Sequence, residues 1–180
     1  MKKKKELINW KWIATISITS FIISMLLSAG AEYTVPKVNL IMQIFIVIAF
    51  IAISILFDMI SIAVTTADEA PFHSMNSRRV KGANVAIQLL KNRDKVASLS
   101  ADVIGDVCGI ITGAASVTIS LGISSLLGIE QFIVSLTVTA ILAAMTIGGK
   151  AIFKPIALAN NKAILYRFCS ILAIFYRTKK

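Results

Sequence analysis

The sequence has few of the residues that enzyme active sites and metal centres use. Its 180 residues include 9 Asp and Glu, one His and two Cys. His73 has no second histidine with which to form a zinc site. Cys108 and Cys169 form no CxxC pair, so we infer neither a disulfide nor a cysteine metal site. No phosphate-binding glycine loop, nucleophile–histidine pair or metalloprotease motif is present, and the sequence therefore predicts a protein that is not an enzyme.

Long polar stretches are also scarce, which leaves no room for a large soluble domain. Hydrophobic residues make up 57% of the chain, and the mean hydropathy is +0.81. Several apolar runs approach or exceed the roughly 20 residues that a helix needs to cross a bilayer. The net charge of +10 could suggest nucleic acid, but the basic residues lie in blocks between apolar runs. The sequence predicts an all-α membrane protein whose partner is the lipid bilayer, not a nucleic acid.

Four apolar runs predict the membrane helices. The run at residues 13–29 follows a basic tail, so it is either a retained first helix or a signal peptide that is cleaved near Ala29. The runs at residues 40–67, 98–124 and 132–149 are expected to form three core transmembrane helices, with the last one broken at Gly148 and Gly149. The chain then divides into residues 1–31, the tail with the first hydrophobic helix or signal peptide, and residues 32–180, the core domain.

Two further segments are amphipathic and too short or too basic to span. Residues 76–96 alternate basic and apolar side chains, which favours a helix on the cytoplasmic membrane surface, with a solvated loop helix as the alternative. The apolar run at residues 163–176 is interrupted by Arg167, and its length also favours an interfacial helix.

The distribution of basic residues predicts the topology. Lys37 lies alone, and all other Lys and Arg residues fall into the tail, the 78–95 segment and the stretch from Lys150 onward. The positive-inside rule then places these three blocks and the C-terminus in the cytoplasm. We expect a multi-pass protein of the plasma membrane, with four spans if the first helix is retained and three if it is cleaved.

The central run carries two acids, Asp102 and Asp106. At 100° per residue they share a face with small and polar residues, while apolar side chains occupy the opposite face, which we interpret as the lipid face. An aspartate at the centre of a membrane helix costs about 2.5–3.5 kcal/mol on insertion scales, so both should face protein, water or a cation. The polar face is Ser98, Asp102, Gly105, Asp106, Gly109, Gly113, Ser116, Ser120 and Ser124, and the lipid face is Ile104, Val107, Ile111, Ala114, Val117 and Leu121.

The preceding run offers a matching polar face, made of Ser54, Asp58, Ser61, Thr65 and Glu69. Hard cations take oxygen ligands from carboxylate, hydroxyl and carbonyl groups, and the two runs supply these types. We therefore predict a cation-binding or gating site. Two alternatives stay open. In the first, the glycines serve helix packing, and the acids are protonated and hydrogen-bonded to a neighbouring helix. In the second, Asp68 and Glu69 provide the N-cap of a helix that begins near Pro71. The candidate ligands are Asp102, Asp106, Thr65, Thr66, Asp68 and Glu69.

The order of four short motifs resembles the transmembrane domain of the CNNM/CorC family of magnesium transport proteins. The sequence Thr65-Thr66-Ala67-Asp68-Glu69 is similar to a hydroxyl-rich segment that ends in Ser-Glu, and Ser77 to Asp94 is similar to the basic segment that follows it. Ile104-Gly105-Asp106 resembles a Gly-Asn motif. Gly149-Lys150-Ala151-Ile152-Phe153-Lys154-Pro155-Ile156-Ala157 resembles a helix end with Gly-Glu-x-x-Pro-Lys. The similarity covers roughly Ser54 to the end.

The resemblance implies a magnesium ion held between the three core helices, and a homodimer formed through membrane helices. Carried over by position, it nominates Thr66, Asp68, Asp106 and position 150. Two departures matter. Lys150 stands where the family has a glutamate, so its ammonium repels a cation or takes its place by pairing with Asp106. The chain also stops without the cytoplasmic pair of CBS domains, so that regulation is absent or comes from a separate cytoplasmic subunit.

These departures keep two alternatives to a magnesium-binding or magnesium-transporting protein. The first is a structural or regulatory membrane subunit that kept the fold and lost transport. The second is a sodium- or proton-coupled carrier, because membrane carboxylates also serve as proton relays.

Overall fold

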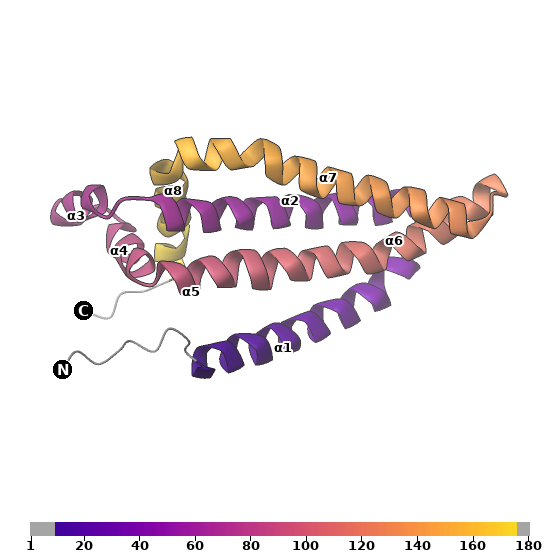
Figure 1. Ribbon diagram of the computed structural model, residues 1–180, viewed down its shortest axis with the longest axis horizontal. Coiled ribbons are helices and arrows are strands. Elements are labelled where there is room, and N and C mark those ends of the chain that lie inside the picture. The colour runs from indigo at the N-terminus through magenta and orange to yellow at the C-terminus, as the bar shows by residue number, and fades with distance from the viewer. Residues whose placement is uncertain (1–9, 176–180) are drawn as a thin grey trace.

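Four long helices lie side by side in the computed structural model, which describes residues 10–175, and each runs antiparallel to the next one in the chain (Figure 1). They are α1 (Trp10–Thr34), α2 (Leu40–Thr66), α7 (Gln131–Ala159), and a continuous rod from Arg93 to Leu127. Each is long and apolar enough to cross a membrane. No strand occurs among the described residues. The chain is therefore an α-helical, multi-pass membrane protein. The rest of the basic tail, residues 1–9, and the end of the last predicted segment, from Tyr176, lie outside the described residues.

The rod that holds the two predicted acids is not a uniform α-helix. It begins as α5 (Arg93–Ser98), passes through the π-helix η2 (Leu99–Gly105) and continues as α6 (Asp106–Leu127). A π-helix bonds each N–H to the carbonyl five residues back, so it is wider and turns less per residue than an α-helix. A helical wheel drawn with a constant step of 100° therefore misplaces the side chains before η2 relative to those after it.

Helix α2 is the centre of the bundle and packs against α6 and α7, while a 3₁₀ turn, η1 (Val35–Lys37), links it to α1. One apolar core lies at this linker end and includes Val47 and Ile51 of α2 with Ala115 and Ile119 of α6. Helix α1 packs against α6, has no buried residue and leans away from the others toward its N-terminal end (Figure 1). The expected three-helix core is thus α2, the rod and α7.

A second apolar core closes the opposite end of the bundle. There α3 (Ala70–Ser77), α4 (Ala83–Lys91) and α8 (Asn161–Phe175) gather at the C-terminal end of α2. The core is built on fully or almost fully buried side chains: Phe72, Leu90, Leu165 and Cys169. The predicted amphipathic segments are therefore helical, and their apolar faces pack on protein.

Gly82 joins α3 to α4 where no other residue fits easily. Its φ of +84° is the left-handed conformation that favours glycine. A Cβ at this position would lie 3.0 Å from the backbone N and Cα of Ser170, which are atoms that cannot rotate aside. The loop therefore packs directly on the backbone of α8.

The predicted break at Gly148 and Gly149 is wrong, because α7 continues to Ala159 through both glycines and through Pro155. A Cβ on Gly149 would collide with the side chain of Ile55, so this glycine serves close packing on α2. Pro155 removes one N–H and one helical bond, a local cost that the neighbouring contacts of α7 with α2 and α8 tolerate.

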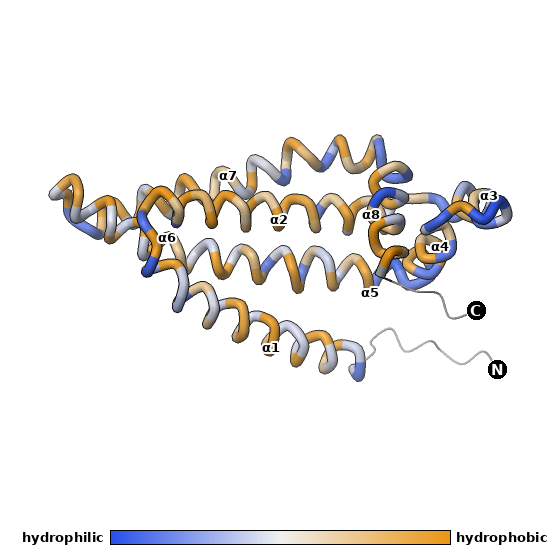
Figure 2. Tube along the Cα trace, turned by 180° about the vertical axis from the view of Figure 1, so that it is seen from behind, coloured by the Kyte–Doolittle hydropathy of each residue, from blue (hydrophilic) through white to orange (hydrophobic). Residues whose placement is uncertain are grey.

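Polar and basic segments collect at one end of the bundle. The N-terminal end of α1 lies on that side together with α3, α4 and α8, whereas Lys37 lies in the linker at the other end (Figure 1). Figure 2 shows the polar colour concentrated around α3 and α4, beside four largely apolar helices. The basic segments that are separated along the sequence therefore lie at the same end of the folded bundle.

Cys169 gives a chemical test of the second core. Burial raises the pKa of its thiol to about 12, and the thiolate, which is the reactive form, is then about a thousandfold scarcer at pH 8 than for a free cysteine. In a Cys108→Ser chain we expect Cys169 to react with a maleimide at least about 100-fold more slowly than a cysteine placed at exposed Lys91. Mass spectrometry of the labelled protein measures both rates. Equal rates would contradict the packing of α8 on α2 and α4.

Candidate functional site

An ion pair inside the bundle joins α2 to α7. The Nζ atom of Lys150 lies 3.8 Å from Oδ1 of Asp58, and the two side chains are 31% and 25% exposed. Asp58 stands eight residues before the end of α2, which is about 12 Å along the helix axis. In a bundle that crosses a hydrocarbon core of about 30 Å, this places the pair within the membrane. Charges at that depth are costly, and an intramembrane pair marks a candidate functional site.

The π-helix brings polar backbone to this pair. The hydroxyl of Ser54 donates a hydrogen bond to the carbonyl of Gly105, at 3.1 Å and out of contact with solvent. A Cβ on Gly105 would lie 3.7 Å from Ser54 Oγ and 4.0 Å from Lys150 Nζ, so all three groups meet at this glycine. We call Ser54, Asp58, Gly105 and Lys150 the polar cluster. It combines a carboxylate, a hydroxyl and an ammonium group at a π-helical turn, a feature often found at functional sites.

The predicted polar face of α2 does face the central rod. Besides the Ser54 contact, the hydroxyl of Ser61 donates to the carbonyl of Ala97 at 3.2 Å, and both serines are buried. Further along the rod, Ser116 and Ser120 are buried as expected, and the hydroxyl groups of Ser116 and Thr139 lie 3.3 Å apart across α6 and α7. Hydroxyl groups thus line the contacts of the rod with both neighbours.

The two acids of the rod lie elsewhere. Asp102 and Asp106 are exposed on the flank of the described chain, whereas Val107 and Ile111, which we predicted to face lipid, are buried. Asp106, Val107 and Ile111 all lie on the regular helix α6, so the wheel relates them correctly, and the error was to turn the acidic side of the rod inward: the side with Val107 and Ile111 is the one that packs on the neighbouring helices. The prediction that these acids point toward α2 is therefore wrong for the single chain. The open space beside Gly109 and Gly113 shows that no helix of the described chain packs on them.

Lys150 is a charge partner, but of a different acid. Pairing with Asp106, one of the two outcomes that we considered for Lys150, does not occur, because the ammonium group of Lys150 lies against Asp58 of the facing helix. The sequence held this signal: Asp58 belongs to the Ser54–Glu69 face of α2, and Lys150 continues the Ser135, Thr139 and Thr146 face of the last span. We missed Asp58 as a site residue because we paired charges by the family motif and not by facing stripes.

The hydroxyl and acid motif at the end of α2 has its own partners. Thr66 Oγ1 donates to the carbonyl of Ile62 at 2.7 Å, and the Asn161 side-chain amide donates to both Thr66 Oγ1 and its carbonyl, at 3.2 and 3.1 Å. Asp68 is exposed in the link that follows. These contacts tie the end of α2 to the start of α8, and they use the Thr66 oxygen that we nominated as a ligand.

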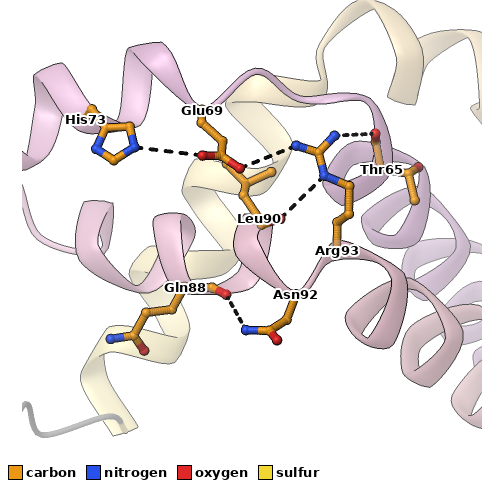
Figure 3. Close-up of polar contacts among 7 residues, drawn as sticks. All are labelled: Thr65, Glu69, His73, Gln88, Leu90, Asn92 and Arg93. Carbon is orange, nitrogen blue, oxygen red and sulfur yellow. Dashed lines mark hydrogen bonds and ion pairs between the residues drawn. The ribbon is translucent and has the colours of Figure 1, made fainter. Parts of the chain in front are cut away.

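Glu69 belongs to a network that Figure 3 shows in full. Its carboxylate lies 3.5 Å from the guanidinium of Arg93 and 3.8 Å from the imidazole of His73. Arg93 also donates to the carbonyls of Thr65 and Leu90, both at 3.4 Å, and so bridges the last turns of α2 and α4. Glu69 precedes α3 but makes no side-chain cap, so its role as a helix cap is not what the structure shows.

The predicted magnesium ligands are not gathered in one place. The Ser54–Gly105 contact puts Asp106 level with Ser54, twelve residues or about 18 Å along α2 from Thr66. Within residues 10–175, no group of three or more His, Cys, Asp or Glu side chains is placed to hold a metal ion. The described conformation does not fit a preassembled magnesium site at these positions. At membrane depth, the Asp58 carboxylate is neutralised by Lys150.

Comparison with known proteins gives no match: no family model, no curated protein and no solved structure is similar to this chain.

Proposed function

We propose that this chain is a cation-handling membrane protein whose functional site is the polar cluster, with a divalent cation, magnesium, as its substrate. The observation that carries the proposal is the Asp58–Lys150 pair between α2 and α7. The CNNM/CorC resemblance supports it, because that family handles magnesium between the corresponding helices. The proposal also includes a homodimer in the plasma membrane, a cytoplasmic C-terminus, and a separate cytoplasmic subunit for regulation.

In this proposal the ammonium group of Lys150 occupies the position of the cation. It lies beside the carboxylate of Asp58 and near the Ser54 hydroxyl group, and hard cations choose these oxygen ligands. A divalent ion beside a fixed ammonium group is repelled, at about 4 Å by several kcal/mol at an effective dielectric of 20. Cation entry therefore requires Lys150 to leave Asp58. Its four-carbon stem and its position nine residues before the end of α7 give it a route toward the basic end of the bundle.

Flux measurements in proteoliposomes test this proposal. We expect Lys150→Met to raise magnesium uptake by at least about tenfold over the wild type, because it removes the competing charge, and Asp58→Asn to abolish uptake. Lys154→Met, one turn further along α7 and exposed, is the matched control and should leave the rate unchanged. A magnesium-sensitive dye inside the vesicles gives the rate per folded protein. Absence of uptake in both the wild type and Lys150→Met would refute the proposal.

A non-transporting subunit is the second candidate, and the scatter of Thr66, Asp68 and Asp106 over about 18 Å favours it. In that case the ion pair only holds α2 against α7. A non-transporting subunit should show no flux in any variant, and magnesium should not change its thermal unfolding temperature. Flux driven by a sodium or proton gradient without magnesium would instead identify a coupled carrier.

A further inference from the structure

A cleft of about 590 Å³ lies at the basic end of the molecule, between the α3–α4 loop and α8. Arg79 and Lys81 supply positive charge to it, and no acidic residue of the described chain lines it. Its other walls include Val80 and Val85 on one side and Ala173 and Ile174 of α8 on the other. The cleft therefore combines two cations with an apolar wall.

The backbone around the cleft is held in an unusual shape. Arg79 has a φ of +55°, which is left-handed and uncommon for a residue with a side chain. Strain of this kind persists where the surrounding structure imposes it, and it clusters at ligand sites. Gly82, three residues on, fixes the same loop against the backbone of Ser170. The position of Arg79 and Lys81 over the cleft is thus determined by packing on α8.

Ser170 adds a polar group that lacks a partner. Ser170 lines the cleft, and its hydroxyl oxygen, which is buried, has no hydrogen-bond partner among the described residues. A buried hydroxyl without a partner loses the hydrogen bonds that it makes in water, and a bound acceptor restores them. A ligand with anionic oxygens pairs with the two cations of the cleft, Arg79 and Lys81.

The position of the cleft selects the class of ligand. It lies beside the C-terminal end of the spanning helix α2, because α8 packs there on Ala63 and Val64. In a bundle that crosses the bilayer, this is the level of the lipid headgroups. The side chain of Ile174 is 78% exposed, and it extends the apolar wall to the outside. A free phosphate ion gains nothing from such a wall, whereas a lipid acyl chain does.

We propose that this cleft binds an anionic phospholipid, with its phosphate at Arg79 and Lys81 and an acyl chain along Val80 and Ile174. Basic residues at the end of a membrane helix attract anionic lipid, and clefts between helices on that side recognise headgroups. The proposal rests on the membrane-spanning bundle and is independent of whether the polar cluster carries a cation.

Native mass spectrometry of the full chain, released from detergent, tests the proposal by counting bound lipids. We expect phosphatidylglycerol to bind, and the Arg79→Gln/Lys81→Gln chain to bind it at least about tenfold more weakly. Arg78→Gln/Arg167→Gln is the matched control, since it removes the same charge from the same end but from residues that do not line the cleft. Its affinity should change by less than about twofold.

Three further results decide the matter. Equal weakening in the two double variants would show a general charge effect and overturn the proposal. If a variant misfolds, the wild type can still be tested with two lipids that have the same acyl chains. Equal binding of phosphatidylglycerol and phosphatidylcholine to the wild type would also overturn the proposal. Full displacement of the lipid by inorganic phosphate would mean that the cleft recognises phosphate without the acyl chain, and would also refute a lipid site.

Discussion

Asp58→Asn alone should lower the free energy of unfolding by about 3 kcal/mol, because it leaves the ammonium group of Lys150 without a counter-charge inside the bundle. Lys150→Met should cost a similar amount by leaving the carboxylate alone. The double variant Asp58→Asn/Lys150→Met should cost about 1 kcal/mol or less, since a neutral pair of similar size needs no compensation. The ion pair is thus expected to appear as a large coupling energy between α2 and α7.

Reversible unfolding in mixed detergent micelles, followed by circular dichroism, measures the four free energies of this cycle. Glu130→Gln is the control, because Glu130 is exposed in the link between α6 and α7 and forms no described ion pair. It should change the free energy of unfolding by less than about 0.5 kcal/mol. If the two single costs simply add in the double variant, Asp58 and Lys150 do not interact, and the basis of the proposed function is lost.

Gly82→Ala should lower the free energy of unfolding by about 3 kcal/mol, more than any other single added methyl group in the chain. The left-handed backbone alone costs an alanine about 1–2 kcal/mol. The new Cβ would also lie 3.0 Å from two backbone atoms of Ser170, so the loop must move away from α8. This movement would open the core around Leu90 and Cys169.

Gly128→Ala separates the two causes. Gly128 ends α6 with a φ of +66°, but a Cβ there meets nothing within 4 Å. It should cost only the backbone term, about 1–2 kcal/mol. Thermal unfolding of both variants under one set of conditions measures the difference. Equal losses at the two glycines would show that the α3–α4 loop is not packed on α8 as described.

Much of the architecture follows from hydropathy and charge. The run at residues 40–67 is α2 to within one residue, and the short amphipathic segments are helices because their apolar side chains recur at helical spacing. The last span was expected to end ten residues too early, at Gly149 in place of Ala159, since Gly148, Gly149 and Pro155 weaken a helix locally. Packing against α2 outweighs those local preferences in α7.

The site was harder to predict, for a reason that lies in the rod. A helical wheel sorts the side chains of one helix into sides, but it does not say which side packs on the neighbouring helices. We expected the acidic side of the rod to face protein, whereas Val107 and Ile111 on the apolar side are buried, so Asp102 and Asp106 lie on the exposed side. Asp58 and Lys150 lie on uninterrupted helices, and their facing stripes were predictable. The error there came from weighting a motif over geometry.

The π-helix has a consequence for how the chain tolerates changes in length. A stretch with five-residue bonding contains one residue more than an α-helix needs to join the same two flanks in phase. Deleting a single residue within Leu99–Gly105 therefore removes the surplus and leaves α5 and α6 in register with their neighbours. The same deletion in α2, which has no surplus, rotates one half of the helix against the other and turns buried Ser54 or Ser61 toward the lipid.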